Sequence, residues 1–375
     1  MKHLIKICFP IILFFFNATV DACTVFYYSD GKIILAGNNE DWPEPFTKIW
    51  YIPSEDNKYG IVHFGWDGQP QGGMNEKGLF YDFTYTPFLK VTKSEGKPFY
   101  EGNLIHKMMQ ECADINEAIE LLNGYNLKFL ERGQMIIGDA KGNSAIIEGD
   151  SIIYKKGDYQ ICTNFSQSQY KEGTYPCDRY KKVDDMLKNN KVDLDLFRNI
   201  LNETHNEGKY KTQYSNIYDL KNKIIYLYYF YDYDNIVQID LNAELQKGKR
   251  TIDMYELFPG NIRGENYRKA ILETMERWKG TKKIINLNPD VYNSYIGKYK
   301  FSFDGIHVII NVTKDDNKLY YSTSEFGKAE LLPESETKFF FVYIDGIWGV
   351  EFKDNQVITT SKGYSFAAER ISHKN

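Results

Sequence analysis

The sequence is short of positive charge and of long apolar runs. Its 46 Lys and Arg residues are outnumbered by 51 Asp and Glu residues, which gives a formal net charge of -5. Proteins that bind nucleic acid rely on a basic surface, so we expect no nucleic-acid partner. Beyond the first 22 residues no apolar run is long enough to cross a bilayer, and we expect no integral membrane segment there.

Cysteine is also scarce, and its spacing does not suggest a disulfide framework. The five cysteines are Cys8, Cys23, Cys112, Cys162 and Cys177. Cys162 and Cys177 could pair in an oxidising compartment, but geometry and not sequence decides this. Cys112 lies near the end of a predicted helix, and we expect it to be a small buried apolar residue.

Signatures of several enzyme classes are missing. The chain has no Gly-x-Ser-x-Gly elbow, no His-Glu-x-x-His helix, no Cys-x-x-Cys pair and no P-loop. The histidines lack the spacing of metal ligands, and we expect structural roles for His63, His106, His205 and His307. The sequence therefore predicts neither a metal site nor a cofactor site.

The N-terminus has the three parts of a secretory signal. Lys2 and Lys6 supply positive charge, Ile7 to Phe16 form a short apolar run, and Val20 to Ala22 offer small residues for cleavage. Cleavage after Ala22 would make Cys23 the first residue of a secreted or periplasmic protein. This pattern predicts residues 1–22 as a signal peptide.

A second interpretation of the same segment stays open. Bacterial lipoprotein signals also end immediately before a cysteine, which then carries lipid. Cys23 would in that case anchor a binding lipoprotein to an outer surface, although the acidic Asp21 fits such a signal poorly. A lipidated Cys23 would have neither a free amine nor a free thiol, and no turnover would be possible.

An N-terminal cysteine can supply both a nucleophile and a base. Its free α-amine has a pKa near 8, so a fair fraction is neutral at ambient pH. The amine can take the proton of the thiol and later give it to a leaving amine. Such a site still needs a carboxylate that orients the amine and donors that stabilise the oxyanion.

Four motifs follow the predicted cleavage point in order. They are Cys23-Thr24 with Gly37-Asn38-Asn39-Glu40-Asp41-Trp42, then Gly73-Met74-Asn75-Glu76-Lys77-Gly78-Leu79, then Asp139-Ala140-Lys141-Gly142-Asn143-Ser144 with Glu148, and Thr163-Asn164. Together they resemble the N-terminal-nucleophile linear-amide hydrolases, the group of penicillin V acylases and choloylglycine (bile salt) hydrolases. The resemblance runs from Cys23 to about Leu245.

The resemblance implies a role for each of five site residues. Cys23 would be the nucleophile and, through its amine, the base, and Asp41 would hold that amine and thiol in place. Asn164 would donate its side-chain amide to the oxyanion, and Tyr85 would line the oxyanion site. Arg179 would be the late arginine that family members carry near the nucleophile.

One position departs from the family. Bile salt hydrolases and penicillin V acylases carry an arginine where this chain has Asn38. Loss of that cation should raise the pKa of the thiol relative to those enzymes, because a nearby positive charge favours thiolate. Arg179 could cover part of this electrostatic role. The departure puts the substrate range in doubt more than the mechanism.

Local signals predict the limits of several elements. Ser29-Asp30-Gly31 is turn chemistry between two strands, and the hairpin can bring Asp41 beside Cys23. Asn75 lies in the turn Asn75-Glu76-Lys77-Gly78, and we expect a structural role for it.

One helix has signals at both ends. Asp114 can cap it with Glu117 reaching back, and Gly124 ends it.

The predicted fold class is α+β. The resemblance implies a four-layer αββα amidase domain over residues 23–260. Charged helical texture predicts a linker over 261–290, with its best helix at Glu265 to Lys279. Short alternating strands over 291–375 predict a small antiparallel β-barrel. That segment resembles the lipocalin-like module of secreted serine hydrolases at Tyr295 to Tyr299, Leu331 to Pro333 and Phe339 to Phe341.

These inferences combine into one expected activity. The chain is expected to be a secreted cysteine amidase that cleaves a linear, non-peptide C–N amide bond through a Cys23 thioester. Its partner would be a small-molecule N-acyl amide. Passage of the acyl group to an amine instead of water would make it an acyltransferase. The sequence leaves the acyl amide and the oligomeric state open.

Overall fold

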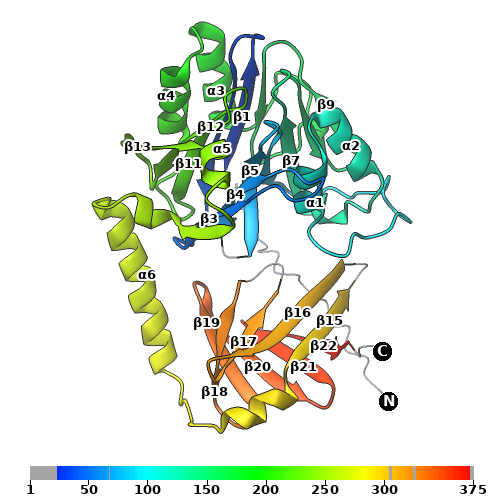
Figure 1. Cartoon of the computed structure of the whole chain (residues 1–375), viewed down its shortest axis with the longest axis vertical. Coiled ribbons are helices and arrows are strands. Elements are labelled where there is room, and N and C mark those ends of the chain that lie inside the picture. The colour runs from blue at the N-terminus through cyan, green and yellow to red at the C-terminus, as the bar shows by residue number, and fades with distance from the viewer. Residues whose placement is uncertain (1–22, 67, 304–305, 324–326, 372–375) are drawn as a thin grey trace. The chain divides into compact units, whose positions relative to one another are not determined.

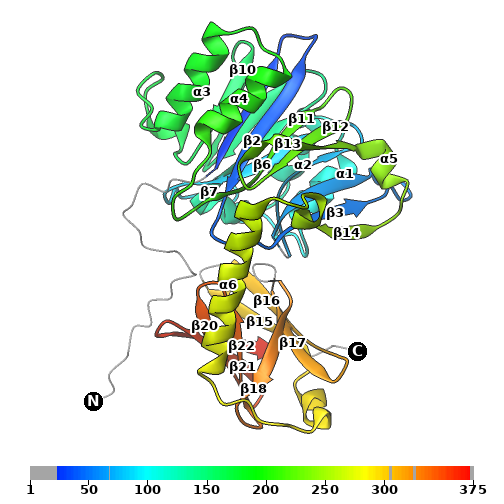
Figure 2. The same cartoon turned by 90° about the vertical axis from the view of Figure 1, so that its left-hand side faces the viewer.

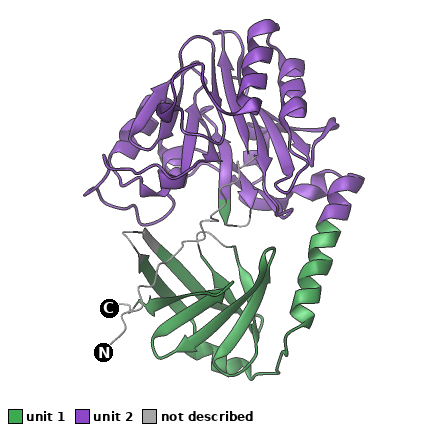
Figure 3. Ribbon diagram, turned by 180° about the vertical axis from the view of Figure 1, so that it is seen from behind, with its two compact units in different colours: residues 1–18, 67–69, 268–375 green, residues 19–66, 70–267 purple. Residues whose placement is uncertain are grey.

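The computed structural model describes residues 23–66, 68–303, 306–323 and 327–371, so the predicted signal peptide lies outside it. The described residues form two compact units (Figure 3). The first, here called the amidase unit, holds the described residues up to 66 and residues 70–267. The second, here called the barrel unit, holds residues 268–371 apart from the gaps, with residues 68–69.

One sheet of the amidase unit, sheet A, has six antiparallel strands (Figure 1). In spatial order they are β10 (Tyr159–Cys162), β1 (Thr24–Ser29), β2 (Ile34–Asp41), β11 (Thr212–Asp219), β12 (Ile224–Tyr229) and β13 (Asp232–Asp240). The predicted turn between the first two strands forms because Asp30 accepts 2.8 Å bonds from the amides of Lys32 and Ile33, and Gly31 takes φ +85°. Strand β2 extends to Asp41, so the motif residues from Gly37 to Asp41 lie in a buried strand.

The other sheet, sheet B, has eight strands (Figure 2). In spatial order they are β14 (Arg250–Asp253), β3 (Thr47–Ile52), β4 (Ile61–Trp66), β5 (Gln69–Asn75), β6 (Phe80–Tyr85), β7 (Gly133–Gly138), β8 (Ser144–Glu148) and β9 (Ser151–Tyr154). Asn75 fixes the turn into β6, because its side chain bonds the amides of Lys77 and Leu79 and the carbonyls of Met109 and Cys112. This is the structural role that turn chemistry predicts for Asn75.

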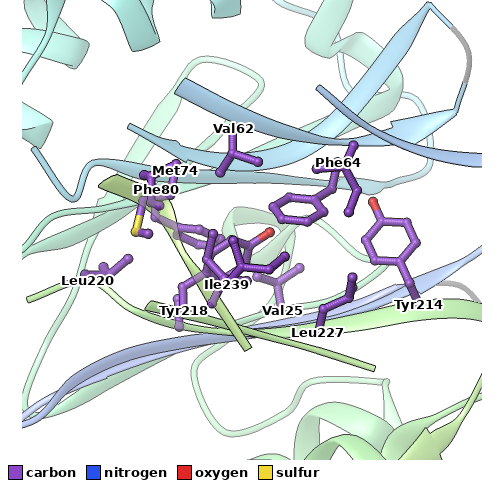
Figure 4. Close-up of a cluster of buried hydrophobic side chains, with 14 of the residues drawn as sticks. Val25, Val62, Phe64, Met74, Phe80, Tyr214, Tyr218, Leu220, Leu227 and Ile239 are labelled. Carbon is purple, nitrogen blue, oxygen red and sulfur yellow. The ribbon is translucent and has the colours of Figure 1, made fainter. Parts of the chain in front are cut away.

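The main core lies between the two sheets (Figure 4). Side chains alternate across a strand, so every second residue of β1 and β2 points into this core. Val25 and Tyr27 of β1 do so, whereas Phe26 between them packs on the opposite face of sheet A. Phe64 and Phe80 enter from sheet B.

Helices cover the outer face of each sheet. On sheet A, α3 (Asp178–Asn189) and α4 (Leu194–Thr204) form a second core with Phe26. On sheet B, α1 (Leu104–Glu111) and α2 (Ile115–Asn123) form a third. These layers confirm the predicted α+β class and its αββα order.

Capping explains why α2 begins and ends as predicted. The Asp114 side chain accepts bonds from the amides of Asn116 and Glu117, and Glu117 reaches back to the amide of Ala113. Gly124 follows as the C-cap. This is the reciprocal pairing of a capping box, which satisfies amides that the helix itself leaves unpaired.

A long helix, α6 (Ile262–Gly280), follows the short α5 (Leu241–Leu245) and covers the predicted helix at Glu265 to Lys279. The division between the two units falls between its residues 267 and 268. Its residues 262–267 belong to the amidase unit, where Tyr267 donates a 2.7 Å bond to the carbonyl of Pro43.

The barrel unit closes on itself with antiparallel strands. They are β15 (Gly297–Phe303), β16 (Ile306–Asp315), β17 (Lys318–Ser322), β18 (Ala329–Pro333), β19 (Lys338–Tyr343), β20 (Gly346–Lys353), β21 (Gln356–Ser361) and β22 (Tyr364–Arg370). The last strand pairs with the first. Aromatic side chains fill the interior, as where Phe341 stacks on Trp348. The predicted C-terminal barrel is confirmed.

Two further features of the described residues bear on sequence-based expectations. No helix there has both the length and the apolar character that a bilayer crossing requires. The cysteines there are free, so Cys162 in β10 and Cys177 before α3 are not bonded to each other. Cys112 is buried against α1 and α2, as expected.

Candidate active site

Cys23 stands immediately before β1, and the strand register decides its neighbour. Thr24 pairs with Asn39 across β1 and β2, so one further step sets Cys23 opposite Glu40. Alternation along β1 turns Cys23 to the same side as Val25, into the space between the sheets. Only 9% of Cys23 is exposed.

The thiol of Cys23 donates a hydrogen bond to Glu40. Its Sγ lies 3.6 Å from Glu40 Oε2, and the side-chain amide of Asn38 donates to Glu40 Oε1 at 3.1 Å. The side-chain oxygen of Asn38, Oδ1, accepts a hydrogen bond from the backbone amide of Asn216 at 3.2 Å. Asn38, which stands where the resemblance implies an arginine, therefore holds a carboxyl group beside the Cys23 thiol.

A second carboxyl group meets Glu40 from the facing sheet. Asp82 on β6 is fully buried, and neither of its carboxyl oxygens has a donor among the described residues. The nearby Glu40 raises the pKa of Asp82, and a hydrogen bond between the two carboxyl groups requires a proton on one of them. Gly72 makes room for Asp82, because a Cβ on Gly72 would lie 2.3 Å from Asp82 Oδ2.

Burial shifts the protonation of all three groups in the same direction. It raises the pKa of Glu40 to about 7, and it raises that of Asp82 well above its usual range, helped by the charge of Glu40. Burial also raises the pKa of the Cys23 thiol, and the charges of Glu40 and Asp41 raise it further. The Cys23 thiol is therefore neutral in the resting protein, and the effect of the missing arginine stays a prediction.

Asp41 ends β2 next to the nucleophile. Its carboxylate accepts a 2.5 Å bond from the hydroxyl of Thr212 on β11, and its backbone amide donates to Cys23, which lowers the thiol pKa. The hairpin thus brings Asp41 beside Cys23, as the sequence predicts. Its role in holding the α-amine stays a prediction.

Arg179 and Asn164 form a hydrogen-bonded pair at the backbone of Cys23. Arg179 Nη1 donates to the Cys23 carbonyl at 2.7 Å and to Thr24 Oγ1 at 2.8 Å. Arg179 Nη2 donates to Asn164 Oδ1 at 2.9 Å. This second contact fixes the orientation of the Asn164 amide, because only its oxygen can accept from the guanidinium.

Tyr85 takes part through its backbone. Asn164 Nδ2 donates a 2.9 Å bond to the carbonyl oxygen of Tyr85, whose side chain is 43% exposed at the end of β6. An amide nitrogen carries two hydrogens, so the second remains for a ligand oxygen. Four of the predicted site residues, Cys23, Arg179, Asn164 and Tyr85, thus form one chain of contacts.

Buried polar groups support the segment that carries Asn164. Gln134 Nε2 donates to Thr84 Oγ1 at 2.9 Å, to the Phe165 carbonyl at 3.1 Å and to the Thr163 carbonyl. Thr84 Oγ1 also donates to the Thr163 carbonyl at 3.1 Å. Strands β6 and β7 therefore set the position of Asn164.

Glu40, Asp82 and Gln134 are the residues near the site that sequence reasoning missed. A signal existed for Glu40, because it lies within the Gly37 to Trp42 motif, and alternation in a buried strand sets it on one face with Asn38. Asp82 and Gln134 carry no such signal, because only the packing of the two sheets brings them near Cys23.

Two histidines, His63 on β4 and His106 on α1, contact each other. His63 Nδ1 lies 2.8 Å from the hydroxyl of Tyr81, and its Nε2 lies 3.1 Å from Nδ1 of His106. Burial lowers the pKa of His63 to about 3, so the ring is neutral. No cluster of three or more His, Cys, Asp or Glu side chains suited to a metal occurs in the part of the chain that the structure describes.

Comparison with known proteins gives a family match and several similar structures. Residues 29–238, more than half of the chain, match the family described as acyl-coenzyme A:6-aminopenicillanic acid acyl-transferase. A search of curated proteins finds no match.

Three solved structures illustrate the likeness. Two of them are variants of conjugated bile acid hydrolase from Clostridium perfringens, which are 19% and 20% identical to this chain. Each alignment covers 61% of this chain and 95% or 96% of the hydrolase chain, with a TM-score of 0.49. Penicillin V acylase from Agrobacterium tumefaciens is 19% identical and covers 62% of this chain and 91% of its own, with a TM-score of 0.48.

Proposed function

The chain belongs to the acyl-coenzyme A:6-aminopenicillanic acid acyl-transferase family, and on this premise we propose that it hydrolyses the amide bond of a small N-acyl substrate with Cys23 as nucleophile. The observation that carries the proposal is the setting of Cys23. Its thiol contacts the carboxyl group of Glu40, while its own backbone is tied through Arg179 to Asn164. A nucleophile, a carboxyl group and an amide donor thus share one site.

The first half of the reaction forms a thioester. Cys23 Sγ attacks the carbonyl carbon of the amide, the carbonyl oxygen becomes an oxyanion, and the C–N bond breaks as the leaving nitrogen takes a proton. Asn164 is suited to stabilise the oxyanion, because Tyr85 and Arg179 already fix its amide group. A donor held in advance needs no reorganisation when the charge develops.

The second half hydrolyses the thioester with water. Water attacks the acyl carbon, the C–S bond breaks, and the acid leaves while the thiol is restored. The α-amine of Cys23 exchanges protons with the leaving amine and with the attacking water. Arg179 keeps Cys23 at the end of β1 throughout, because it bonds the Cys23 carbonyl and the Thr24 hydroxyl.

Activation requires a free N-terminus at Cys23. We propose that residues 1–22 are an export signal and that cleavage after Ala22 frees both the α-amine and the thiol outside the cytoplasm. This half of the proposal is supported by the charge, the apolar run and the small residues of that segment.

Intact mass measurement tests the whole proposal. The protein is exported by a bacterial host and incubated with a panel of N-acyl amides that includes phenoxymethylpenicillin, a glycine-conjugated bile acid and N-acyl amino acids. We expect a wild-type chain that begins at unmodified Cys23, a transient acyl adduct on Cys23, and release of the amine. Cys23→Ala should form no adduct and release no amine. A diacylglycerol-modified Cys23, or a retained signal with an unreactive thiol, would instead support the surface-anchored lipoprotein.

The family match favours a second candidate, transfer of the acyl group to an amine. The thioester is common to both reactions, so the nucleophile that attacks it decides the outcome. Turnover in increasing concentrations of an amine acceptor, 6-aminopenicillanic acid among them, separates the two. A new amide formed at the expense of free acid identifies a transferase, whereas acid release unaffected by the amine identifies a hydrolase.

A further inference from the structure

Glu40 is the nearest proton acceptor that the structure gives the Cys23 thiol. Its Oε1 is occupied by the amide of Asn38, and its Oε2 accepts the thiol at 3.6 Å. Glu40 is only 1% exposed. A buried carboxyl group costs free energy, so its place beside a nucleophile calls for a function.

The α-amine is a poor acceptor at neutral pH. A free α-amine has a pKa near 8, so at pH 7 about nine in ten are already protonated and can only donate. Glu40, by contrast, gains its charge near pH 7. The two groups therefore suit opposite tasks, with the carboxylate accepting a proton and the ammonium supplying one.

We propose that Glu40 is a catalytic residue whose carboxylate takes the Cys23 thiol proton as the thioester forms and returns it to sulfur as the thioester is hydrolysed. This inference rests on the proposed function and reassigns one proton transfer from the α-amine to Glu40. Glu40 contacts the Cys23 thiol, whereas Arg179 contacts the Cys23 carbonyl and Asn164.

The proton count closes over one cycle. In acylation the S–H bond breaks with its proton passing to Glu40, the S–C bond forms, and the α-ammonium protonates the leaving nitrogen as the C–N bond breaks. In deacylation water attacks the acyl carbon and gives its proton to the now neutral α-amine. The C–S bond then breaks, and the sulfur takes back its proton from Glu40. Amide and water give acid and amine, with both groups restored.

Asp82 acts as a positioning residue for Glu40. The interaction between the two carboxyl groups raises the pKa of Asp82 and lowers that of Glu40 against the effect of burial, so Asp82 is the proton donor to Glu40. The titratable groups that face Glu40 are Cys23 beside it, Asp82 and Tyr81 on β6, and Tyr214 and Tyr218 on β11. Since the tyrosine pKa values are raised, Glu40 is the group in this set that ionises near neutrality.

Glu40→Gln tests the proposal, with Glu120→Gln on the exposed face of α2 as the matched control. The variant keeps the size of the side chain but cannot take a proton. Turnover of the best panel amide is expected to fall at least about 100-fold, the usual scale of general base catalysis. Alkylation of Cys23 by iodoacetamide is expected to stay equal or become faster, because removal of the charge lowers the thiol pKa.

The two readouts separate the possible outcomes. Amide turnover within about fivefold of wild type, or turnover that rises together with alkylation, overturns the role of Glu40. Failure of the wild-type protein to form any acyl adduct overturns the proposed function itself, and the two failures are thus distinct.

The pH profile tests the same role in a chain that keeps Glu40. Wild-type turnover is expected to rise with pH through about 7, as Glu40 ionises. Asp82→Leu removes the donor to Glu40, so this rise is expected to move to higher pH. A rise that stays in place in Asp82→Leu overturns the proposal, even if Glu40→Gln fails to fold.

Discussion

The two sides of Cys23 are built on different physical principles. One side, here called the donor side, consists of Thr24, Asn164 and Arg179, joined by hydrogen bonds of 2.7–2.9 Å. The other, here called the acid side, consists of Glu40, Asp82 and Tyr214 between the sheets. Burial raises the pKa of each acid-side group, and the Tyr214 hydroxyl has no hydrogen-bond partner among the described residues.

The difference shows that Cys23 contacts one region that stabilises the fold and another that lowers its stability. Donor-side groups are paired in the resting protein, so they stabilise the fold and the site together. The two acid-side carboxyl groups hold protons that they would lose in neutral water, and the Tyr214 hydroxyl is buried without a partner in the described part of the chain, which costs stability. In the proposed mechanism, stabilisation of the oxyanion and transfer of the thiol proton fall to separate parts of the molecule, and substitutions can test them separately.

Removal of the nucleophile should have the largest effect. Cys23→Ala is expected to lower amide turnover at least about 1,000-fold, because no thioester can form. The fold should persist, because alanine fits the same buried position. Turnover of the panel amides and intact mass provide the measurement, with Cys112→Ala as the control for loss of a buried thiol. Residual turnover near that of wild type would assign the reaction to another residue.

Asn164→Asp tests the donor side directly. The substitution keeps the partner of Arg179 but removes the amide hydrogens, so kcat is expected to fall about 100- to 1,000-fold with a small change in KM. The ion pair with Arg179 should keep the fold intact. Steady-state kinetics against Asn123→Asp at the end of α2 provide the comparison. A loss confined to KM would show that Asn164 binds substrate without stabilising the oxyanion.

Arg179→Lys should have a smaller effect on the same side. A lysine ammonium cannot reach the Cys23 carbonyl, Thr24 and Asn164 with the fixed geometry of a guanidinium. Loss of one charge-assisted bond corresponds to roughly a 10- to 100-fold fall in kcat. Arg198→Lys on α4 serves as the control. If Arg179→Lys matches Arg198→Lys, the guanidinium does not set the geometry of the site.

Sequence reasoning was strong where local pattern decides structure. Capping residues predicted where α2 begins and ends, and turn chemistry at Asp30 and Gly31 predicted the hairpin of β1 and β2. The motifs identified the family, and the N-terminal-nucleophile fold and enzyme class are confirmed. The residues of the donor side were named in advance, because the family resemblance implies roles for Asn164 and Arg179 and Thr24 follows Cys23 in the first motif.

The acid side was missed for a physical reason. Glu40 and Asp82 lie 42 positions apart on strands of different sheets, and only sheet packing brings them together. Tyr85 shows the same limit, because its backbone carbonyl and not its phenol bonds Asn164. A backbone contact leaves no trace in the choice of residue.

The pH dependence of stability reports on the acid side. Glu40 has an ordinary pKa of 4.5 in the unfolded chain and about 7 in the folded one. Between these values the folded state binds more protons, so the free energy of unfolding is expected to fall as pH rises from about 4.5 to 7. The loss is on the order of 3 kcal/mol. Glu40→Gln lacks this group, so its stability should gain on wild type across that window.

Urea unfolding of both proteins at several pH values measures the difference. The comparison cancels the carboxylates elsewhere, such as Asp30 and Asp114, whose lowered pKa values act in the opposite direction. A constant difference between wild type and Glu40→Gln from pH 4.5 to 7 would mean that Glu40 titrates normally, and the acid side would lose its distinct character.

Gly72→Ala should have the smallest effect and concerns only the space that the acid side needs. A methyl group at Gly72 would lie 2.3 Å from Asp82 Oδ2, so the carboxyl group must move away. Overpacking of this kind costs about 1–3 kcal/mol. Gly280→Ala at the end of α6 meets no atom within 4 Å and serves as the control. If both variants unfold at the same urea concentration, Asp82 has room to move. The interaction between Asp82 and Glu40 would then depend on proton sharing alone and not on the packing around the two carboxyl groups.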